Sequence, residues 1–136
     1  MGRSLGELAL PAQVAAQEAL QECHRLGIET LVTCTYRSPE EQAVLYAQGR
    51  TAPGKKVTNA APGQSFHQYR VALDVYVVEA GKIDWTGTNP KWQTMAQVFK
   101  AHGFEWAGDW KRFKELPHFQ MTGGHPLAYF QAGGKL

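Results

Sequence analysis

The sequence has no apolar run of about 18 residues, so we expect no segment that spans a membrane. Its first residues, MGRSLGELALPAQ, also lack the apolar stretch of a signal peptide. We therefore expect synthesis and retention in the cytoplasm until another factor gives access to other compartments. The excess of one sign of charge is also small, because the net charge is only +2. That excess is too small for the dense basic patch of a nucleic-acid binder, although it favours an anionic polymer such as a cell wall.

Cysteine is equally scarce. Cys23 and Cys34 are the only two, and their spacing excludes a CxxC redox motif or a cysteine-rich metal site. We interpret both as buried thiols that pack like small apolar residues. A bridge between them is an alternative that requires the first helix to pack on the first strand at this point.

The bulk composition is that of a globular protein. Hydrophobic residues make up 43% of the 136 positions and charged residues 19%, which fits one domain over residues 1–136. Periodicity and turn signals predict helices over 8–26, 38–48 and 89–102, and strands over 30–36, 71–78, 104–106 and 118–121. Helices and strands alternate without regular βαβ spacing. We therefore predict an α+β fold with a small, mainly antiparallel sheet packed with about three helices.

Two features of this pattern stand out. Ser38-Pro39-Glu40-Glu41 matches a capping box with proline at the first helical position. Residues 50–66, with two Pro-Gly pairs and no periodicity, are predicted to form a loop long enough to suggest a functional role. The tail after Gly123 has no strong pattern.

An acid lies in the middle of the predicted strand VALDVYVV. Alternation places Asp74 with Ala72, Tyr76 and Val78 on one face of this strand. Burying an unpaired carboxylate costs several kcal/mol, so a positive partner must compensate Asp74. An arginine or lysine is one such partner, and a metal ion is the other.

Two histidines are candidates to share a metal with Asp74. His67 stands seven residues earlier, where the long loop can return its imidazole over the strand face. His118 follows Pro117, which disfavours helix, so Glu115 and His118 are expected to flank a turn. Two histidines and one carboxylate leave a fourth position for water, as in catalytic zinc sites, where the pKa of that water falls to about 7. Glu115 would then act as the general base.

The order of these motifs resembles the LAS peptidases, which comprise lysostaphin-type enzymes, D-alanyl-D-alanine metallopeptidases and hedgehog-like domains. The motifs are Ser65-x-His67 with Asp74 seven residues after the histidine, followed by Glu115-x-Pro117-His118-Phe119. Tyr36-Arg37-Ser38 and Gly108-Asp109-Trp110 are similar to the L-alanyl-D-glutamate endopeptidases of that group. The resemblance runs from about residue 30 to residue 121.

The resemblance implies a site as well as a fold. It implies zinc held by His67, Asp74 and His118, with Glu115 as the catalytic carboxylate where many relatives have aspartate. It also implies that Arg37 holds a substrate carbonyl or carboxylate and stabilises the developing oxyanion. An ion pair at a strand end is the alternative interpretation of Arg37.

The remaining site candidates are substrate contacts. Ser65, Tyr69 and Trp110 are expected to line the cleft, although Ser65 could simply terminate the loop. Arg70 stands where relatives usually have glycine. It must either avoid positive φ or accept strain of about 1–2 kcal/mol, and it could reach toward the cleft and alter substrate choice.

These observations favour one function. We expect a zinc-dependent peptidoglycan endopeptidase that hydrolyses the L-alanyl-D-glutamate bond of stem peptides. The resemblance suggests a monomeric phage or prophage endolysin that reaches the wall after a partner permeabilises the membrane. Two alternatives stay open: a D-alanyl-D-alanine carboxypeptidase or dipeptidase, and a non-catalytic zinc-containing module that binds the wall.

Overall fold

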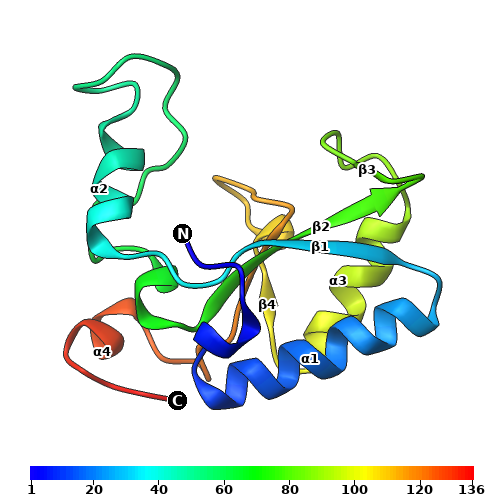
Figure 1. Ribbon diagram of the computed structural model, residues 1–136. Helices are drawn as coiled ribbons and strands as arrows, with labels where there is room; N and C mark the ends of the chain where they lie inside the picture. The colour runs from blue at the N-terminus through cyan, green and yellow to red at the C-terminus, as the bar shows by residue number, and fades with distance from the viewer.

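The computed structural model describes residues 1–136 and contains one antiparallel sheet with strand order β1-β2-β5-β4, with β3 paired to β2 (Figure 1). The strands are β1 (Glu29–Cys34), β2 (Ala72–Glu79), β3 (Lys82–Ile83), β4 (Glu105–Trp106) and β5 (His118–Gln120). The helices are α1 (Leu10–Arg25), α2 (Pro39–Ala47), α3 (Lys91–Ala101) and α4 (Leu127–Gln131). Three short 3-10 helices complete the fold: η1 (Leu5–Glu7), η2 (Phe66–Tyr69) and η3 (Ala107–Asp109).

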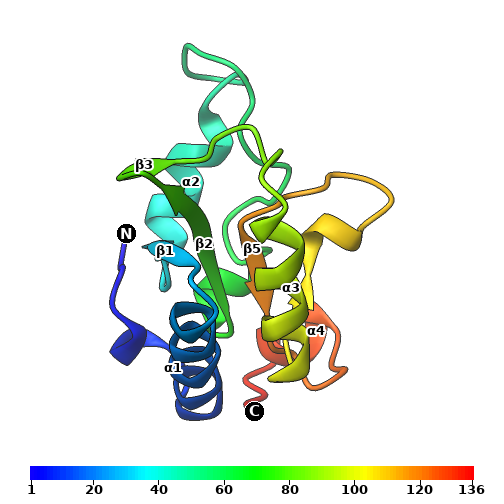
Figure 2. The same cartoon turned by 90° about the vertical axis from the view of Figure 1, so that its right-hand side faces the viewer.

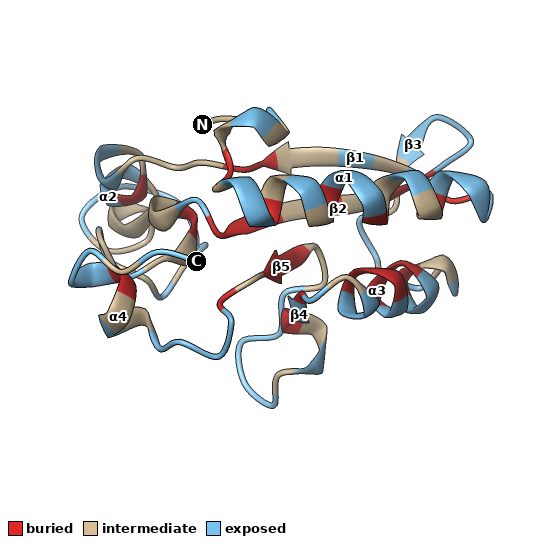
Figure 3. Ribbon diagram, turned by 90° about the horizontal axis from the view of Figure 1, so that it is seen from below, coloured by how far each residue is buried: buried red, intermediate tan, exposed pale blue.

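The hydrophobic core lies on one face of β2. Leu73, Val75 and Val77 point into it and are fully buried, because strand side chains alternate between the two faces. Helices α1 and α3 pack over this face (Figures 2 and 3), and their buried residues form one hydrophobic cluster with these strand side chains. Asp74 and Tyr76 therefore point to the opposite face of the sheet, where the long loop and α2 lie.

Aromatic packing closes the core between α3 and β5. Phe99 of α3 stacks on Phe119 with ring centroids 4.4 Å apart, and it meets Phe104 edge-on at 5.3 Å. Both Phe99 and Phe119 are fully buried. Since β5 also carries His118, this contact fixes the position of β5 and thereby the position of His118.

Truncation of Phe99 tests this role. Phe99→Ala is expected to lower the free energy of unfolding by about 3–5 kcal/mol, because it removes buried apolar surface and leaves a cavity. Urea unfolding followed by circular dichroism measures the loss. A matched control is Phe113→Ala, since the Phe113 side chain is 68% exposed and its removal should cost little. Equal effects of the two substitutions would contradict the packing described.

The observed elements confirm the predicted α+β fold with its small antiparallel sheet. The capping box is also confirmed: Ser38 accepts from the backbone N–H of Glu41, whose side chain accepts from Ser38 N–H. Helix α4 was not predicted, because five residues are too few to show a period. It is held by Phe130, whose ring packs edge-on against Phe66 at 5.9 Å.

Arg70 has a positive φ and therefore accepts strain, which is the second of the two alternatives that the sequence left open. Its φ is 63°, in the left-handed region, at a cost of about 1–2 kcal/mol. The side chain turns away from the cleft, donates to the carbonyl oxygen of Glu7 at 2.9 Å and lies over the ring of Tyr36. A direct effect of Arg70 on substrate choice is therefore not supported.

The two cysteines are free, so the bridged alternative does not occur. Cys23 is part of the core, and Cys34 ends β1 opposite Asp74. None of the helices combines the length and apolar character that a membrane crossing requires.

Candidate metal centre

Three elements bring His67, Asp74 and His118 together. Asp74 and His118 are direct partners in the β2–β5 ladder, so the sheet register itself places them side by side. His67 lies in η2, whose first turn is fixed by a capping box between Ser65 and Gln68. Asp74 Oδ1 lies 3.2 Å from His67 Nε2 and 3.3 Å from His118 Nδ1. The long loop thus places the imidazole of His67 over the face of β2 that carries Asp74.

These distances fit a tetrahedral metal site. Zinc bonds to histidine nitrogen and carboxylate oxygen are about 2.0–2.2 Å long, so neighbouring ligand atoms in a tetrahedron lie roughly 3.3 Å apart. The two imidazole rings have centroids 5.1 Å apart and an interplanar angle of 73°. His67 and His118 are buried, and Asp74 is half-buried. The three residues therefore offer one protected, three-ligand set.

A carbonyl fixes the orientation of His67. Its Nδ1 lies 2.9 Å from the backbone oxygen of Thr35, an atom that can only accept a hydrogen bond. Nδ1 must therefore carry a proton. In the neutral ring the lone pair is then on Nε2, the nitrogen that faces Asp74.

Gln120 and Glu105 fix the protonation of His118, which differs from that of His67 because here Nε2 carries the proton. His118 Nε2 lies 2.9 Å from Gln120 Oε1, and Gln120 Nε2 donates to Glu105 at 2.9 Å. Because the Glu105 carboxylate can only accept, the Gln120 oxygen must face His118 and accept its Nε2 proton. The lone pair of neutral His118 is therefore on Nδ1, which also faces Asp74.

Two neutral imidazoles thus aim lone pairs at one carboxylate oxygen. This arrangement is repulsive unless a cation, either a proton or a metal ion, lies between them. Burial by itself lowers the pKa of His67, but the Asp74 carboxylate outweighs burial and raises that pKa to about 10. Burial by itself raises the pKa of Asp74, but hydrogen bonds from His118 and His67 hold it well below its usual range. Metal binding would displace the proton that bridges these groups in the metal-free protein.

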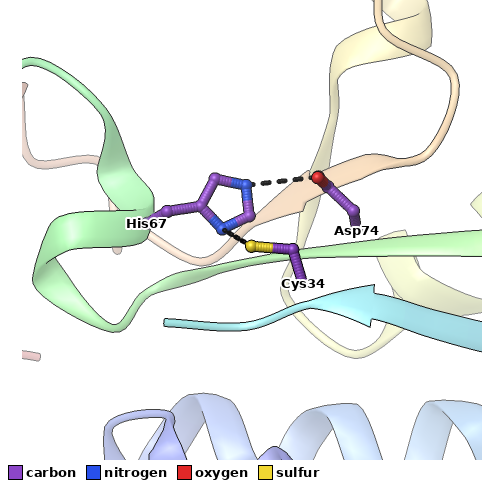
Figure 4. Close-up of side chains that lie close together, drawn as sticks. All are labelled: Cys34, His67 and Asp74. Atoms are coloured by element: carbon purple, nitrogen blue, oxygen red, sulfur yellow. Dashed lines mark hydrogen bonds and ion pairs between the residues drawn. The ribbon is translucent and has the colours of Figure 1, made fainter. Parts of the chain in front are cut away.

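Cys34 lies close enough to form a second potential ligand set with His67 and Asp74. Figure 4 shows, however, that its sulfur approaches the Nδ1 edge of the imidazole at 3.7 Å, whereas Asp74 lies at the Nε2 edge. The ring nitrogen nearest the sulfur, Nδ1, is already bonded to the Thr35 carbonyl, whereas Nε2, the nitrogen with the free lone pair, faces Asp74. The geometry therefore favours His118 over Cys34 as the third ligand.

Arg37 lies beside the three residues. Its guanidinium is 3.8 Å from Asp74 Oδ2 and donates to Gln42 Oε1 at 3.0 Å. Gln42 is fully buried and donates to the Ala60 carbonyl at 2.7 Å, so it ties Arg37 to the long loop. Arg37 thus forms the ion pair that the sequence left as an alternative, and it also lines the cleft.

The cleft around these residues has a volume of about 330 Å³. Glu115, Ser65 and Trp110 line it, and the Trp110 ring lies 5.7 Å from the ring of His118. Ser65 also accepts from the backbone N–H of His67 at 3.3 Å, so it caps η2 as well as reaching the cleft. Tyr69 differs from expectation: it lies outside the cleft, where its hydroxyl donates to the Gly63 carbonyl at 2.6 Å.

The sequence did not reveal the groups that orient the histidines. The partners are the Thr35 carbonyl, Gln120 and Glu105, none of which belongs to a recognisable motif. Gln120 lies two residues after His118, so strand alternation places both side chains on the same face of β5. That spacing was the one signal that could have identified Gln120.

Removing this support tests the role of Gln120. Gln120→Leu leaves His118 Nε2 without its acceptor, and the apparent affinity for zinc is expected to fall about 10–100-fold. Competition with a chromophoric chelator measures the affinity. Gln93→Leu on the exposed side of α3 is the matched control and should bind zinc like the wild type. Wild-type affinity in Gln120→Leu would show that Gln120 does not orient His118.

Comparison with known proteins agrees with the site. A family model described as D-alanyl-D-alanine carboxypeptidase matches residues 58–121, the segment that holds all three predicted ligands. The peptidoglycan L-alanyl-D-glutamate endopeptidase CwlK of Bacillus subtilis is 43% identical over 103 residues, which cover 70% of this chain and 62% of CwlK. The L-alanyl-D-glutamate peptidase of Listeria phage A118 is 30% identical over 120 residues, which cover 88% of this chain and 40% of that enzyme.

The chain thus spans less than two thirds of the length of either curated relative. Among solved structures, the L-Ala D-Glu endopeptidase ChiX of Serratia marcescens shares the fold, with a TM-score of 0.66 and 22% sequence identity. The match covers 87% of this chain and 83% of ChiX. Sequence, fold and the order of the site residues agree, and they make the chain a relative of the L-alanyl-D-glutamate and D-alanyl-D-alanine peptidases named above.

Proposed function

We propose that the chain is a zinc-dependent endopeptidase that hydrolyses the L-alanyl-D-glutamate bond of peptidoglycan stem peptides. One observation carries this proposal: hydrogen bonds on the outer nitrogens of His67 and His118 direct both inner lone pairs at Asp74. The names of CwlK and of the Listeria phage enzyme support the choice of bond. The two histidines and one carboxylate support zinc as the metal.

The proposed site is of the catalytic kind. Structural zinc sites have four protein ligands, whereas catalytic sites have three and keep one position for water or substrate. When bound here, zinc would act as a Lewis acid toward the scissile carbonyl and would activate the attacking water. The cleft in front of Asp74 supplies the access that such a reaction needs.

Glu115 is proposed as the general base. It lies in the turn before β5, where the His118 N–H donates to the Glu115 carbonyl at 3.2 Å. This bond ties the base to a ligand three residues away, and no side-chain hydrogen bond or ion pair occupies the carboxylate. Glu115 can therefore take a proton from the attacking water and pass it to the leaving amine.

Arg37 is proposed to bind substrate at the other side of the cleft. Gln42 holds its guanidinium in place, so little entropy is lost when a substrate carbonyl or carboxylate binds. Asn59 and Gln64 also line the cleft and offer further hydrogen bonds. This polar, cationic end suits the acidic part of a stem peptide.

The two loops that contribute residues to the cleft carry positive charge. Lys55 and Lys56 lie in the long loop, and Lys111, Arg112 and Lys114 lie in the loop before β5; all five are exposed, and none pairs with a carboxylate. Both loops contribute residues to the cleft, Thr58 and Asn59 from the first and Trp110 and Glu115 from the second. These loops therefore favour an anionic polymer such as the wall. We propose that the chain acts there as a monomeric endolysin after membrane permeabilisation, in keeping with the phage origin of one relative.

Digestion of purified peptidoglycan with the zinc-loaded chain tests the proposed function. Mass spectrometry of the fragments should find new D-glutamate amino termini, and a chelator should abolish their release. Loss of terminal D-alanine would instead support the carboxypeptidase that the matching family model describes. A chain that binds zinc and wall but releases no fragment would be a binding module.

A further inference from the structure

A second hollow, of about 320 Å³, opens beside the cleft on the other side of Glu115. Glu115 lines both spaces, so the two meet at the proposed base. The chemistry of the second hollow differs from that of the first. Its lining includes three aromatic rings, those of Tyr76, Trp85 and Trp92, together with Leu116, Pro117, Gly87, Asp84 and Lys114.

Trp85 is unusual within this hollow. Its side chain is 73% exposed, although tryptophan normally buries most of its surface. The ring meets Tyr76 edge-on at 5.1 Å, and Tyr76 in turn meets the buried Trp92 at 5.9 Å. The three rings form an aromatic platform whose outer member faces solvent. The Trp85 ring is therefore accessible to a ligand that enters the hollow.

The loop that presents Trp85 is rigidly built. The Asp84 carboxylate accepts from the Thr86 hydroxyl at 2.7 Å and from Trp92 Nε1 at 2.8 Å, and it also accepts from backbone N–H groups of the loop. These bonds lower the pKa of Asp84 to about 2, the Thr86 bond first. Trp85 is thus exposed on a loop held in one conformation, which limits the entropy lost on binding.

The same loop is fitted to the segment that carries the base. Gly87 has a φ of 70°, and a Cβ at this position would overlap Leu116 Cδ1. Glycine is therefore required for the close approach of the Trp85 loop to Leu116, the residue after Glu115. Tyr76 lies two residues after Asp74 on the same strand face, about 7 Å further along β2. The platform therefore begins two residues from the proposed metal ligand Asp74.

We propose that the exposed ring of Trp85, supported from behind by Tyr76 and the buried Trp92, binds a pyranose ring of the glycan strand, a subsite that rests on the proposed function. The apolar face of a sugar ring packs on an aromatic face, and its hydroxyls reach the polar group in the lining of the hollow, here Lys114. The stem peptide needs the cationic cleft with Arg37 instead. Only one alanine, about 3.5 Å of extended chain, separates the scissile bond from the sugar-linked end of the peptide.

This arrangement assigns a direction to the substrate. The glycan-linked alanine lies over Glu115 toward Trp85, and the D-glutamate and the residues after it extend toward Arg37. The chain would then cleave stem peptides that are still attached to sugar more efficiently than free peptides of the same sequence.

Two substrates with one peptide sequence test the subsite. One carries an N-acetylmuramyl group on the L-alanine, and the other carries only an N-acetyl group. In the zinc-loaded chain, Trp85→Ala should lower kcat/KM for the muramyl substrate several-fold to about tenfold, mainly through KM, with no change for the acetyl peptide. Trp85→Phe should retain most of the wild-type value. Val44→Ala removes a side chain of matching exposure, 72%, outside both hollows and should change neither substrate.

The outcomes separate the subsite from the proposed function. Equal losses on both substrates, or none, would overturn the sugar subsite while leaving the peptidase intact. Absence of cleavage by the wild type would overturn the peptidase. The subsite is then measured alone, by NMR titration of the zinc-loaded chain with N-acetylmuramyl-L-alanine: a shift of the Trp85 indole resonance, with weaker binding in Trp85→Ala, supports it. Unchanged binding in Trp85→Ala overturns it.

Discussion

Asp74→Ala is expected to bind much less than one zinc per chain and to release no detectable peptidoglycan fragments. The substitution removes one of three proposed ligands, and it also removes the carboxylate that both imidazoles face. In the metal-free protein it leaves His67 buried without its negative partner, and loss of one member of such a pair costs about 3–5 kcal/mol. Elemental analysis of the dialysed protein measures the zinc, and thermal unfolding measures the stability.

The matched control for this substitution is Asp109→Ala. Asp109 is half exposed and pairs with Lys100 on the surface at 2.5 Å, so its loss should change stability by at most about 1 kcal/mol. Zinc content in this control should stay at one per chain. Full zinc content in Asp74→Ala would move the metal site elsewhere in the molecule.

Glu115→Gln is expected to keep zinc and lose activity by about 10²–10⁴-fold. An amide fills the same space as the carboxylate but cannot accept the proton of the attacking water. Glu115 is no proposed ligand, and its side chain makes no hydrogen bond in the structure, so stability and metal content should not change. Initial rates of wall digestion, taken with zinc analysis on the same sample, separate the two effects.

Glu115→Asp provides the conservative comparison, because many relatives carry aspartate at this position. It shortens the side chain by one methylene and keeps the base, so part of the activity should survive. Lysis at the wild-type rate by Glu115→Gln would exclude Glu115 as the general base.

Much of the site was predictable because its key residues lie in local sequence patterns. Asp74 was evident as an acid within the strand, and the β2–β5 pairing gave it His118 as a direct neighbour. The position of His67 depended on how the long loop returns, which no period encodes. The resemblance to LAS peptidases supplied that contact, and the capping box of Ser65 and Gln68 explains it physically.

The parts that were missed depend on contacts between distant segments. The Thr35 carbonyl and Glu105 act on His67 and His118 through the tertiary fold, so neither could be recognised from its own neighbours along the chain. Tyr69 has a side chain suited to lining a cleft, yet its hydroxyl donates to the Gly63 carbonyl and holds the loop. Arg70 lies in the left-handed region despite its side chain, because Tyr36 and Glu7 give that side chain partners.

A crystal of the zinc-loaded chain, measured at the zinc absorption edge, tests the central claim most directly. The account predicts one anomalous peak within about 2.0–2.2 Å of His67 Nε2, an Asp74 oxygen and His118 Nδ1, with Cys34 outside bonding distance. A peak bonded to the Cys34 sulfur at about 2.3 Å, or one remote from Asp74, would contradict it.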